Sequence, residues 1–140
     1  MAFNLLIVDD SVSIRQIIKR VISISGFITG DIYEAENGLA AIKVLAGKRV
    51  DLVLSDIHMP QMDGITLLEK VKKNRALCHI PVVMVTTEAR EQLVNKVMEL
   101  GASGYITKPF HPEEIKQLLQ RILGVEDAGD DKTEFEEGDF

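Results

Sequence analysis

Five residues whose side chains suit phosphate chemistry each follow a short apolar run in this sequence. They are three aspartates, a threonine and a lysine: Asp9, Asp10, Asp56, Thr86 and Lys108. Carboxylate oxygens are ligands that Mg²⁺ prefers, and an aspartate can also act as a nucleophile that forms an acyl phosphate. A lysine ammonium and a threonine hydroxyl both bind phosphate oxygens. If the fold brings these side chains together, they predict magnesium-assisted transfer of a phosphoryl group to an aspartate.

The apolar runs predict strands that alternate with helices. Runs such as Leu5–Val8 are short and uninterrupted, which is typical of a strand buried on both faces. Between them, apolar residues recur at helical spacing, and Gly or Pro residues mark the ends. The expected strands are Leu5–Val8, Ile32–Ala35, Leu52–Ser55, Val82–Val85 and Gly104–Thr107. The expected helices run from Ser11 to Gly26, over Leu39–Ala46, after Gly64, over Ala89–Leu100, and from Pro112 to Ile122.

Five strands alternating with five helices predict an α/β fold in which a parallel sheet is covered on both faces. In such sheets, ligands bind outside the carboxyl ends of the strands. The five candidate residues all follow strand ends, so we expect them at one edge of the sheet. Taken alone, an aspartate pair before a helix would be a cap, and a Lys-Pro pair would be a turn. Their shared edge is what favours a site, and a divalent cation would offset the repulsion among the carboxylates.

The negative charge of the chain is concentrated at its end. Residues 125–140 hold eight acids and one lysine, a charge of −7, so the net charge of −6 leaves +1 for residues 1–124. A body this close to neutral lacks the basic footprint of nucleic-acid-binding proteins. We interpret residues 1–124 as one domain and residues 125–140 as an acidic tail, which is either disordered and solvating or binds a basic partner surface.

Two features predict a cytosolic protein that is not inserted into a membrane. The first ten residues have no basic start, and no apolar run approaches the roughly 18 residues needed to span a bilayer. Cys78 is the only cysteine, which excludes an internal disulfide and a cysteine-cluster zinc site. We interpret Cys78 as a structural or surface thiol.

The combination of motifs resembles the receiver domains of two-component response regulators. The resemblance covers residues 4–123 and rests on Asp9-Asp10, the stretch DIHMPQMDG from Asp56, Thr86 at the end of VVMVT, and GYITKPF with Tyr105 and Lys108. It is greatest to stand-alone CheY-type chemotaxis regulators. It implies a flavodoxin-like sheet with the strand order 2-1-3-4-5 known for CheY, and five helices.

The resemblance also implies how the aspartates would act. Asp56 would attack the phosphohistidine of a partner histidine kinase. Asp10 and Asp56 would bind Mg²⁺ directly, Asp9 would bind it through water, and the backbone carbonyl of His58 would be a further ligand. The side chains of His58 and Glu88 would either position or exclude the water that removes the phosphate, or be solvated loop residues.

The resemblance further implies a switch in which residues around the phosphoryl group change position. Lys108 would pair with the phosphoryl group, and Thr86 would move toward it, although Thr87 could instead supply the hydroxyl because only one of two adjacent strand residues points the right way. Tyr105 would follow Thr86 inward and change an output face made by the fourth helix, fifth strand and fifth helix. Without the resemblance, Tyr105 would be interpreted as a packed strand aromatic. The Lys108-Pro109 bond is expected to be cis.

We therefore expect a phosphorylation-gated binding module that modifies itself and is not a turnover enzyme. A chemotaxis regulator that binds a flagellar motor switch protein or a phosphatase competes with a phosphorelay intermediate or phosphate sink. A phosphatase with an aspartyl-phosphate intermediate is disfavoured, because that class has Asp-x-Asp-x-Thr after its first strand and this chain has DDSVS from Asp9. Nucleotide-binding glycine motifs are absent from the sequence.

Overall fold

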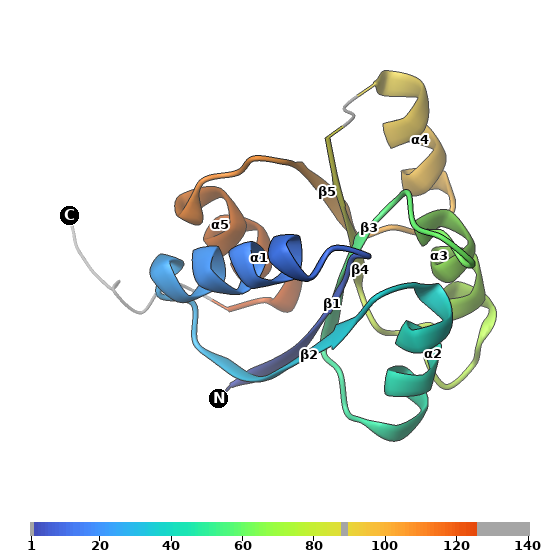
Figure 1. Cartoon of the computed structure of the whole chain (residues 1–140), viewed down its shortest axis with the longest axis horizontal. Helices are drawn as coiled ribbons and strands as arrows, with labels where there is room; N and C mark the ends of the chain where they lie inside the picture. Colours follow the sequence, from blue (N-terminus) through green and yellow to red (C-terminus); the bar gives the residue numbers. More distant parts are fainter. Residues whose placement is uncertain (1, 88–89, 126–140) are drawn as a thin grey trace.

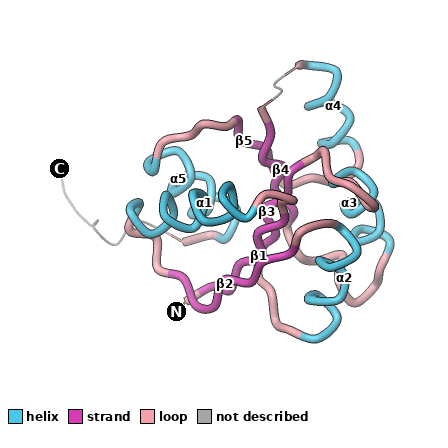
Figure 2. Tube along the Cα trace, viewed as in Figure 1, coloured by secondary structure: helices cyan, strands magenta, loops and turns pink. Residues whose placement is uncertain are grey.

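The predicted parallel sheet is present in the computed structural model, which describes residues 2–87 and 90–125. Its five strands are β1 (Phe3–Val8), β2 (Thr29–Ala35), β3 (Leu52–Asp56), β4 (Val82–Thr86) and β5 (Gly104–Thr107). They are all parallel, and they lie in the order β2-β1-β3-β4-β5 (Figures 1 and 2). The flavodoxin-like topology is therefore confirmed, and β1 and β3 lie side by side in the centre.

Helices cover both faces of this sheet. They are α1 (Val12–Ser25), α2 (Gly38–Gly47), α3 (Gly64–Lys73), α4 (Glu91–Glu99) and α5 (Pro112–Leu123). α1 and α5 cover one face, and α2, α3 and α4 cover the other (Figure 1). Among the described residues, no helix is both long enough and apolar enough to cross a membrane.

The central strands bury side chains on both faces, as their uninterrupted apolar runs predict. Leu6 and Val8 of β1 belong to the cluster beneath α2 and α3, whereas Leu5 and Ile7 belong to the cluster beneath α1 and α5. All four are at most 1% exposed. Burying each such side chain contributes about 1.5–3 kcal/mol, so the strands that carry the candidate site are firmly held.

Three helix starts use capping side chains next to functional segments. The Ser11 hydroxyl accepts from the Ile14 N–H at 3.2 Å, and the side-chain Oδ1 of Asn37 accepts from the Ala40 N–H at 2.9 Å. Asp63 accepts from Thr66 N–H at 2.8 Å at the start of α3. These bonds satisfy orphan donors of each first turn, so the loops before α1, α2 and α3 have defined ends.

Several predicted boundaries were wrong by a few residues. β2 begins at Thr29, three residues before the predicted Ile32, because its exposed first half is held by backbone pairing with β1 and not by apolar burial. The fourth helix begins at Glu91 and ends at Glu99, which is shorter than predicted; residue 89 lies outside the described residues. Gly47 is inside the last turn of α2, and the cap is Lys48.

Candidate phosphoryl-acceptor site

The strands place the candidate residues at one edge of the sheet. Asp9 directly follows β1, Asp56 ends β3, Thr86 ends β4, and Lys108 directly follows β5. Carboxylate oxygens of Asp9, Asp10 and Asp56 all lie within 4.8 Å of one another. The predicted convergence of acids and lysine is therefore confirmed, and it follows from the parallel arrangement of strands that are far apart in sequence.

Asp9 is the most buried acid of the cluster, at 2% exposure. Its Oδ1 accepts from the Ser11 N–H at 2.9 Å, and its Oδ2 lies 3.3 Å from Lys108 Nζ. Its backbone N–H donates to the Ala35 carbonyl of β2 at 3.0 Å. Both carboxylate oxygens and the backbone are thus held, so the Asp9 side chain has a fixed position in the cluster.

Asp56 is more accessible than Asp9, and its ionised form is disfavoured by its surroundings. Its Oδ1 accepts from the Ile57 N–H at 2.8 Å, and its Oδ2 is 3.9 Å from Lys108 Nζ. Burial raises the pKa of the Asp56 carboxyl above its usual value; the attraction of Lys108 lowers it, and repulsion by Asp9 and Asp10 raises it again. An ionised Asp56 is consequently short of positive charge, which a divalent cation bound by the three carboxylates would supply.

Lys108 is positioned by the ends of two strands. Its backbone N–H donates to the Thr86 carbonyl at 2.7 Å, and its side chain is 18% exposed. The Lys108-Pro109 peptide bond is cis, as expected. The ammonium lies between Asp9 and Asp56, so it can contact an anion attached to Asp56 without leaving the edge of the sheet.

The loop after Asp56 is anchored at both ends by close backbone approaches. The Gly64 N–H donates to the Ile57 carbonyl at 2.8 Å, and a Cβ at Gly64 would lie 2.1 Å from the Asp56 carbonyl oxygen. The Gly38 N–H donates to the Met62 carbonyl at 3.0 Å, and Met62 is buried while Met59 packs beside it. Both methionines pack, as predicted, and only glycine fits at position 64.

The pair formed by Arg15 and Glu34 supports the site and was not identified from sequence. Arg15 Nη1 donates to the backbone carbonyl of Asp9 at 2.5 Å, and its Nε donates to Glu34 Oε1 at 2.8 Å. Lys19 Nζ also contacts Glu34, at 3.2 Å. The Arg15 hydrogen bond is the largest of several effects that lower the pKa of Glu34. One sequence signal was available: a base near a helix start opposes the helix dipole, so Arg15 needs another reason to be there.

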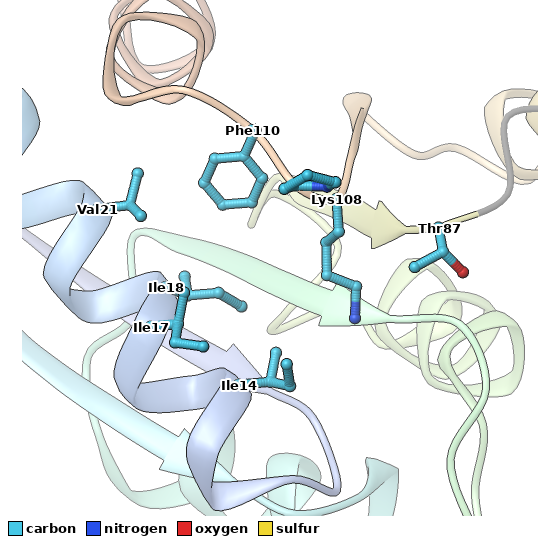
Figure 3. Close-up of a pocket in the computed structure, with 8 residues that line it drawn as sticks. Ile14, Ile17, Ile18, Val21, Thr87, Lys108 and Phe110 are labelled. Carbon is cyan, nitrogen blue, oxygen red and sulfur yellow. The ribbon is translucent and has the colours of Figure 1, made fainter.

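The two threonines at the end of β4 have different surroundings. Thr86 is 2% exposed, whereas Thr87 is exposed and lines a groove with Lys108 (Figure 3). Thr86 therefore has the burial expected of a residue at the edge of the site, and the choice between the two hydroxyls stays a prediction. His58 is exposed, and Glu88 lies outside the described residues.

Tyr105 lies on the neighbouring strand and points to the surface. It pairs with Met84 of β4, two pairs before the pair that Thr86 makes with Thr107, and its exposure is 42%. Together with Met98 of α4 and Arg121 of α5, it lines a depression of about 400 Å³ over β5. Tyr105 is therefore not a fully packed strand aromatic in this structure, and it is close to the predicted output face.

Comparisons with known proteins agree with this geometry. Residues 5–120 match the model of the response regulator receiver domain. The chain is 38% identical to chemotaxis protein CheY1 of Helicobacter pylori, over 89% of this chain and 99% of that one. It is 37% identical to chemotaxis protein CheY-3 of Vibrio cholerae, over 86% and 91%.

Solved structures give the same result. Chemotaxis response regulator CheY4 of Vibrio cholerae superposes with a TM-score of 0.77 at 31% identity, covering 87% of this chain and 99% of that one. A CheY-like response regulator receiver domain protein of Methanospirillum hungatei gives a TM-score of 0.76 at 27% identity, over 89% and 95%.

Proposed function

Because this chain belongs to the response regulator receiver domain family, we propose that Asp56 accepts a phosphoryl group from the phosphohistidine of a histidine kinase. One Asp56 oxygen attacks phosphorus, the bond between phosphorus and the imidazole nitrogen breaks, and the histidine leaves with that electron pair. The observation that carries this proposal is the cluster of three carboxylates within 4.8 Å beside a lysine, because such a set suits a cation and a phosphate together.

The residues of the cluster also fit a Mg²⁺ ion. Asp10 and Asp56 would bind it directly, Asp9 would act through water, and the His58 carbonyl would add a ligand. The raised pKa of Asp56, caused first by burial and also by the neighbouring carboxylates, supports this assignment, since the negative charge of Asp56 is not fully compensated in the structure. The ion would offset the charge of the carboxylates and of the incoming phosphoryl group.

Lys108 and Thr86 would respond to the new phosphate. Phosphorylation adds about −1.5 to −2 charges with strong acceptor oxygens. Lys108 already lies 3.9 Å from Asp56, and a hydroxyl at the end of the adjacent strand is the next available donor. Movement of Thr86 would leave room for Tyr105 to turn inward and alter the face formed by α4, β5 and α5.

We assign this switch to chemotaxis signalling, with a flagellar motor switch protein or a phosphatase as the partner that reads the α4-β5-α5 face. The two chemotaxis relatives, matched over at least 86% of this chain, support the assignment. In this proposal the chain modifies itself and releases its phosphate, so it is a signalling domain of the cytosol and not a turnover enzyme.

The test is phosphorylation of purified protein with acetyl phosphate and Mg²⁺, followed by intact mass measurement. We expect wild type to gain one phosphoryl group and Asp56→Asn to gain none. Asp63→Asn is the matched control, because Asp63 is a carboxylate that only caps α3, and it should be phosphorylated like wild type. A modified Asp56→Asn protein would contradict the proposal.

Pull-down of phosphorylated and unphosphorylated chain then tests the pathway. Binding of a purified motor switch protein that increases on phosphorylation supports the chemotaxis assignment. Transfer of the phosphoryl group onward to a histidine domain would instead identify a phosphorelay intermediate. The Asp56 chemistry and the pathway can therefore fail separately.

A further inference from the structure

Gln61 has a backbone conformation that most residues disfavour. Its φ is 66°, and within residues 2–87 and 90–125 it is the one residue other than glycine with a positive φ. In this left-handed region a Cβ lies too close to the following carbonyl oxygen, a contact that glycine avoids. Strained residues persist where their surroundings hold them, and they are concentrated at functional sites. Gln61 lies in the loop between Asp56 and α3, so what holds it bears on the site.

A side-chain hydrogen bond holds Gln61 in this conformation. Asn37 Nδ2 donates to Gln61 Oε1 at 3.2 Å. Glycine at position 61 would relieve the backbone but would lack this acceptor. The Asn37 amide is itself fixed, because Asn37 is only 8% exposed and its Oδ1 accepts from the Ala40 N–H at 2.9 Å. The residue that caps α2 therefore also holds the loop that follows β3.

The backbone at the start of α2 holds the next residue of the same loop. The Gly38 N–H donates to the Met62 carbonyl at 3.0 Å, and a Cβ at Gly38 would lie 2.5 Å from Met62 Cγ. A side chain at position 38 would therefore push the loop away. The start of α2 and the loop between β3 and α3 lie side by side as a result (Figure 1). Two consecutive residues of one segment thus bind two consecutive residues of the other.

The end of β2 is also bonded to the opposite side of the aspartate cluster. The Ala35 carbonyl accepts from the Asp9 N–H at 3.0 Å. Glu34 pairs with Arg15, which donates to the Asp9 carbonyl. Residues 34–38 therefore contact both the backbone of Asp9 and the loop that follows Asp56. One short segment sets the position of these two parts of the site relative to each other.

We propose that Gln61 is a positioning residue for the metal site, and that its contact with Asn37 keeps the loop containing His58 beside the aspartates before an ion binds. This inference rests on the proposed function, in which the His58 carbonyl and the aspartates bind Mg²⁺. A ligand group that is ordered in advance loses less conformational freedom on binding, which increases affinity. Glutamine is used at this position in spite of its φ because the contact needs a side-chain acceptor.

A purely structural role for Gln61 is the competing explanation. In that case the Asn37 contact would stabilise the fold and nothing more. Glycine, which adopts a positive φ without steric cost, would then serve the metal site as well as glutamine does. The two explanations therefore differ in the Mg²⁺ affinity that they expect of a chain with glycine at position 61.

Mg²⁺ titrations of the full chain, followed by amide spectra, separate the two explanations. We expect affinity to fall roughly three- to tenfold in Gln61→Ala, which loses the acceptor, and further in Gln61→Gly, which also frees the backbone. Urea unfolding in EDTA should give the opposite order, with a higher midpoint for Gln61→Gly than for Gln61→Ala because glycine relieves the strain. Wild-type affinity in Gln61→Gly would overturn the proposal.

Replacing Asn37 tests the partner of Gln61 without removing the helix cap. Serine is also a good N-cap, but it lacks the amide that donates to Gln61. We expect Asn37→Ser to lower Mg²⁺ affinity as much as Gln61→Ala does, and the double variant to lower it no further, because both changes remove one contact. Losses that add in the double variant would contradict the pairing.

Asn74→Ala is the matched control for these variants. Asn74 Oδ1 accepts from the Ala76 N–H at 2.8 Å, so the change also removes a side-chain hydrogen bond from a loop. This loop precedes β4 and therefore lies at the opposite edge of the sheet from the aspartates. Mg²⁺ affinity should match that of wild type, and a loss as large as that in Gln61→Ala would refute a local effect.

Amide hydrogen exchange in EDTA measures the order of the loop without the ion. The Gly38 and Gly64 N–H groups report on it directly, because they donate to the carbonyls of Met62 and Ile57. Their exchange should be roughly fivefold faster or more in Gln61→Gly than in wild type. Unchanged exchange would overturn the positioning role of Gln61. Wild type that neither binds Mg²⁺ nor accepts a phosphoryl group would instead overturn the proposed function.

Discussion

Two charged clusters next to β1 differ in how well their charges are matched. At the sheet edge, Asp9, Asp10 and Asp56 share Lys108, and the pKa of Asp56 is raised. Between α1 and β2, the single carboxylate of Glu34 faces both Arg15 and Lys19, and its pKa is lowered. The first cluster has more negative than positive charges, and the second has fewer. The difference supports our proposal that the first cluster takes a cation and a phosphate, whereas the second holds the backbone beside it.

Replacing one lysine from each cluster should separate these roles most strongly. Lys108→Met should lower the rate of phosphorylation by acetyl phosphate roughly 10²- to 10³-fold, the usual effect of removing one donor from a developing charge. Lys19→Met should stay within about twofold of wild type, because Arg15 still pairs with Glu34. The rates are measured by mass spectrometry over time. Comparable losses in the two variants would remove the distinction between the clusters.

Magnesium should stabilise the protein through the first cluster alone. At a concentration of 100 times its Kd, a ligand that binds only the folded state adds about 2.7 kcal/mol to the free energy of unfolding. We expect this gain in wild type and in Glu34→Gln. Asp10→Asn should lose most of it, and the exposed position of Asp10 keeps the fold intact. Urea titration with Mg²⁺ or EDTA measures the gain, and an equal gain in Asp10→Asn would place the ion elsewhere.

Arg15 joins the two clusters, so its removal should affect both. Arg15→Gln loses the charged partner of Glu34 and the donor to the Asp9 carbonyl, which should cost about 1–3 kcal/mol of unfolding free energy. It should also weaken Mg²⁺ binding several-fold, measured by calorimetry, because Arg15 holds the carbonyl of Asp9, which belongs to the proposed metal site. Arg20→Gln, on the exposed side of the same helix, is the control. A loss of stability with unchanged Mg²⁺ affinity would reduce Arg15 to a packing role.

The smallest effects should appear in the pH dependence of stability without metal. Because the pKa of Glu34 is lowered on folding, its contribution is present above its unfolded pKa and is lost as pH falls through the folded value. The pKa of Asp56 is raised, so its contribution is present below the unfolded value and is lost as pH rises through the folded one. From about pH 3 to pH 7, Glu34→Gln should become less stable than wild type and Asp56→Asn more stable. Urea titrations in EDTA measure these stabilities, and differences from wild type that change in the same direction with pH in both variants would contradict this account.

Sequence alone predicted most of the fold and the acidic part of the site. Alternation of strands and helices predicted the parallel sheet, and acids directly after β1 and β3 predicted their common edge, whereas the strand order 2-1-3-4-5 was implied by the resemblance to receiver domains. The predicted start of β2 was wrong, since Thr29–Asp31 are exposed and carry no apolar signal. Glu88 and residues 126–140 lie outside the described residues, so the predictions made for them stay predictions.

Contacts between distant segments could not be predicted in the same way. The pairing of Arg15 with Glu34 joins residues 19 apart in sequence, and no motif around either residue predicts the other as its partner. Tyr105 was expected to turn inward with Thr86 on phosphorylation, which stays a prediction; the structure shows it at the surface of β5.

The amino-acid sequence by itself determined the chemistry of this protein: carboxylates and a lysine at strand ends, buried strands that must pair in parallel, and glycine where the chain turns after Asp56. These features are local, so residue type and spacing express them. Tertiary structure decided the electrostatic balance. Burial and the distances between side chains decide that the charge of Glu34 is compensated and that of Asp56 is not fully so, and they exist only once the sheet and its helices have assembled.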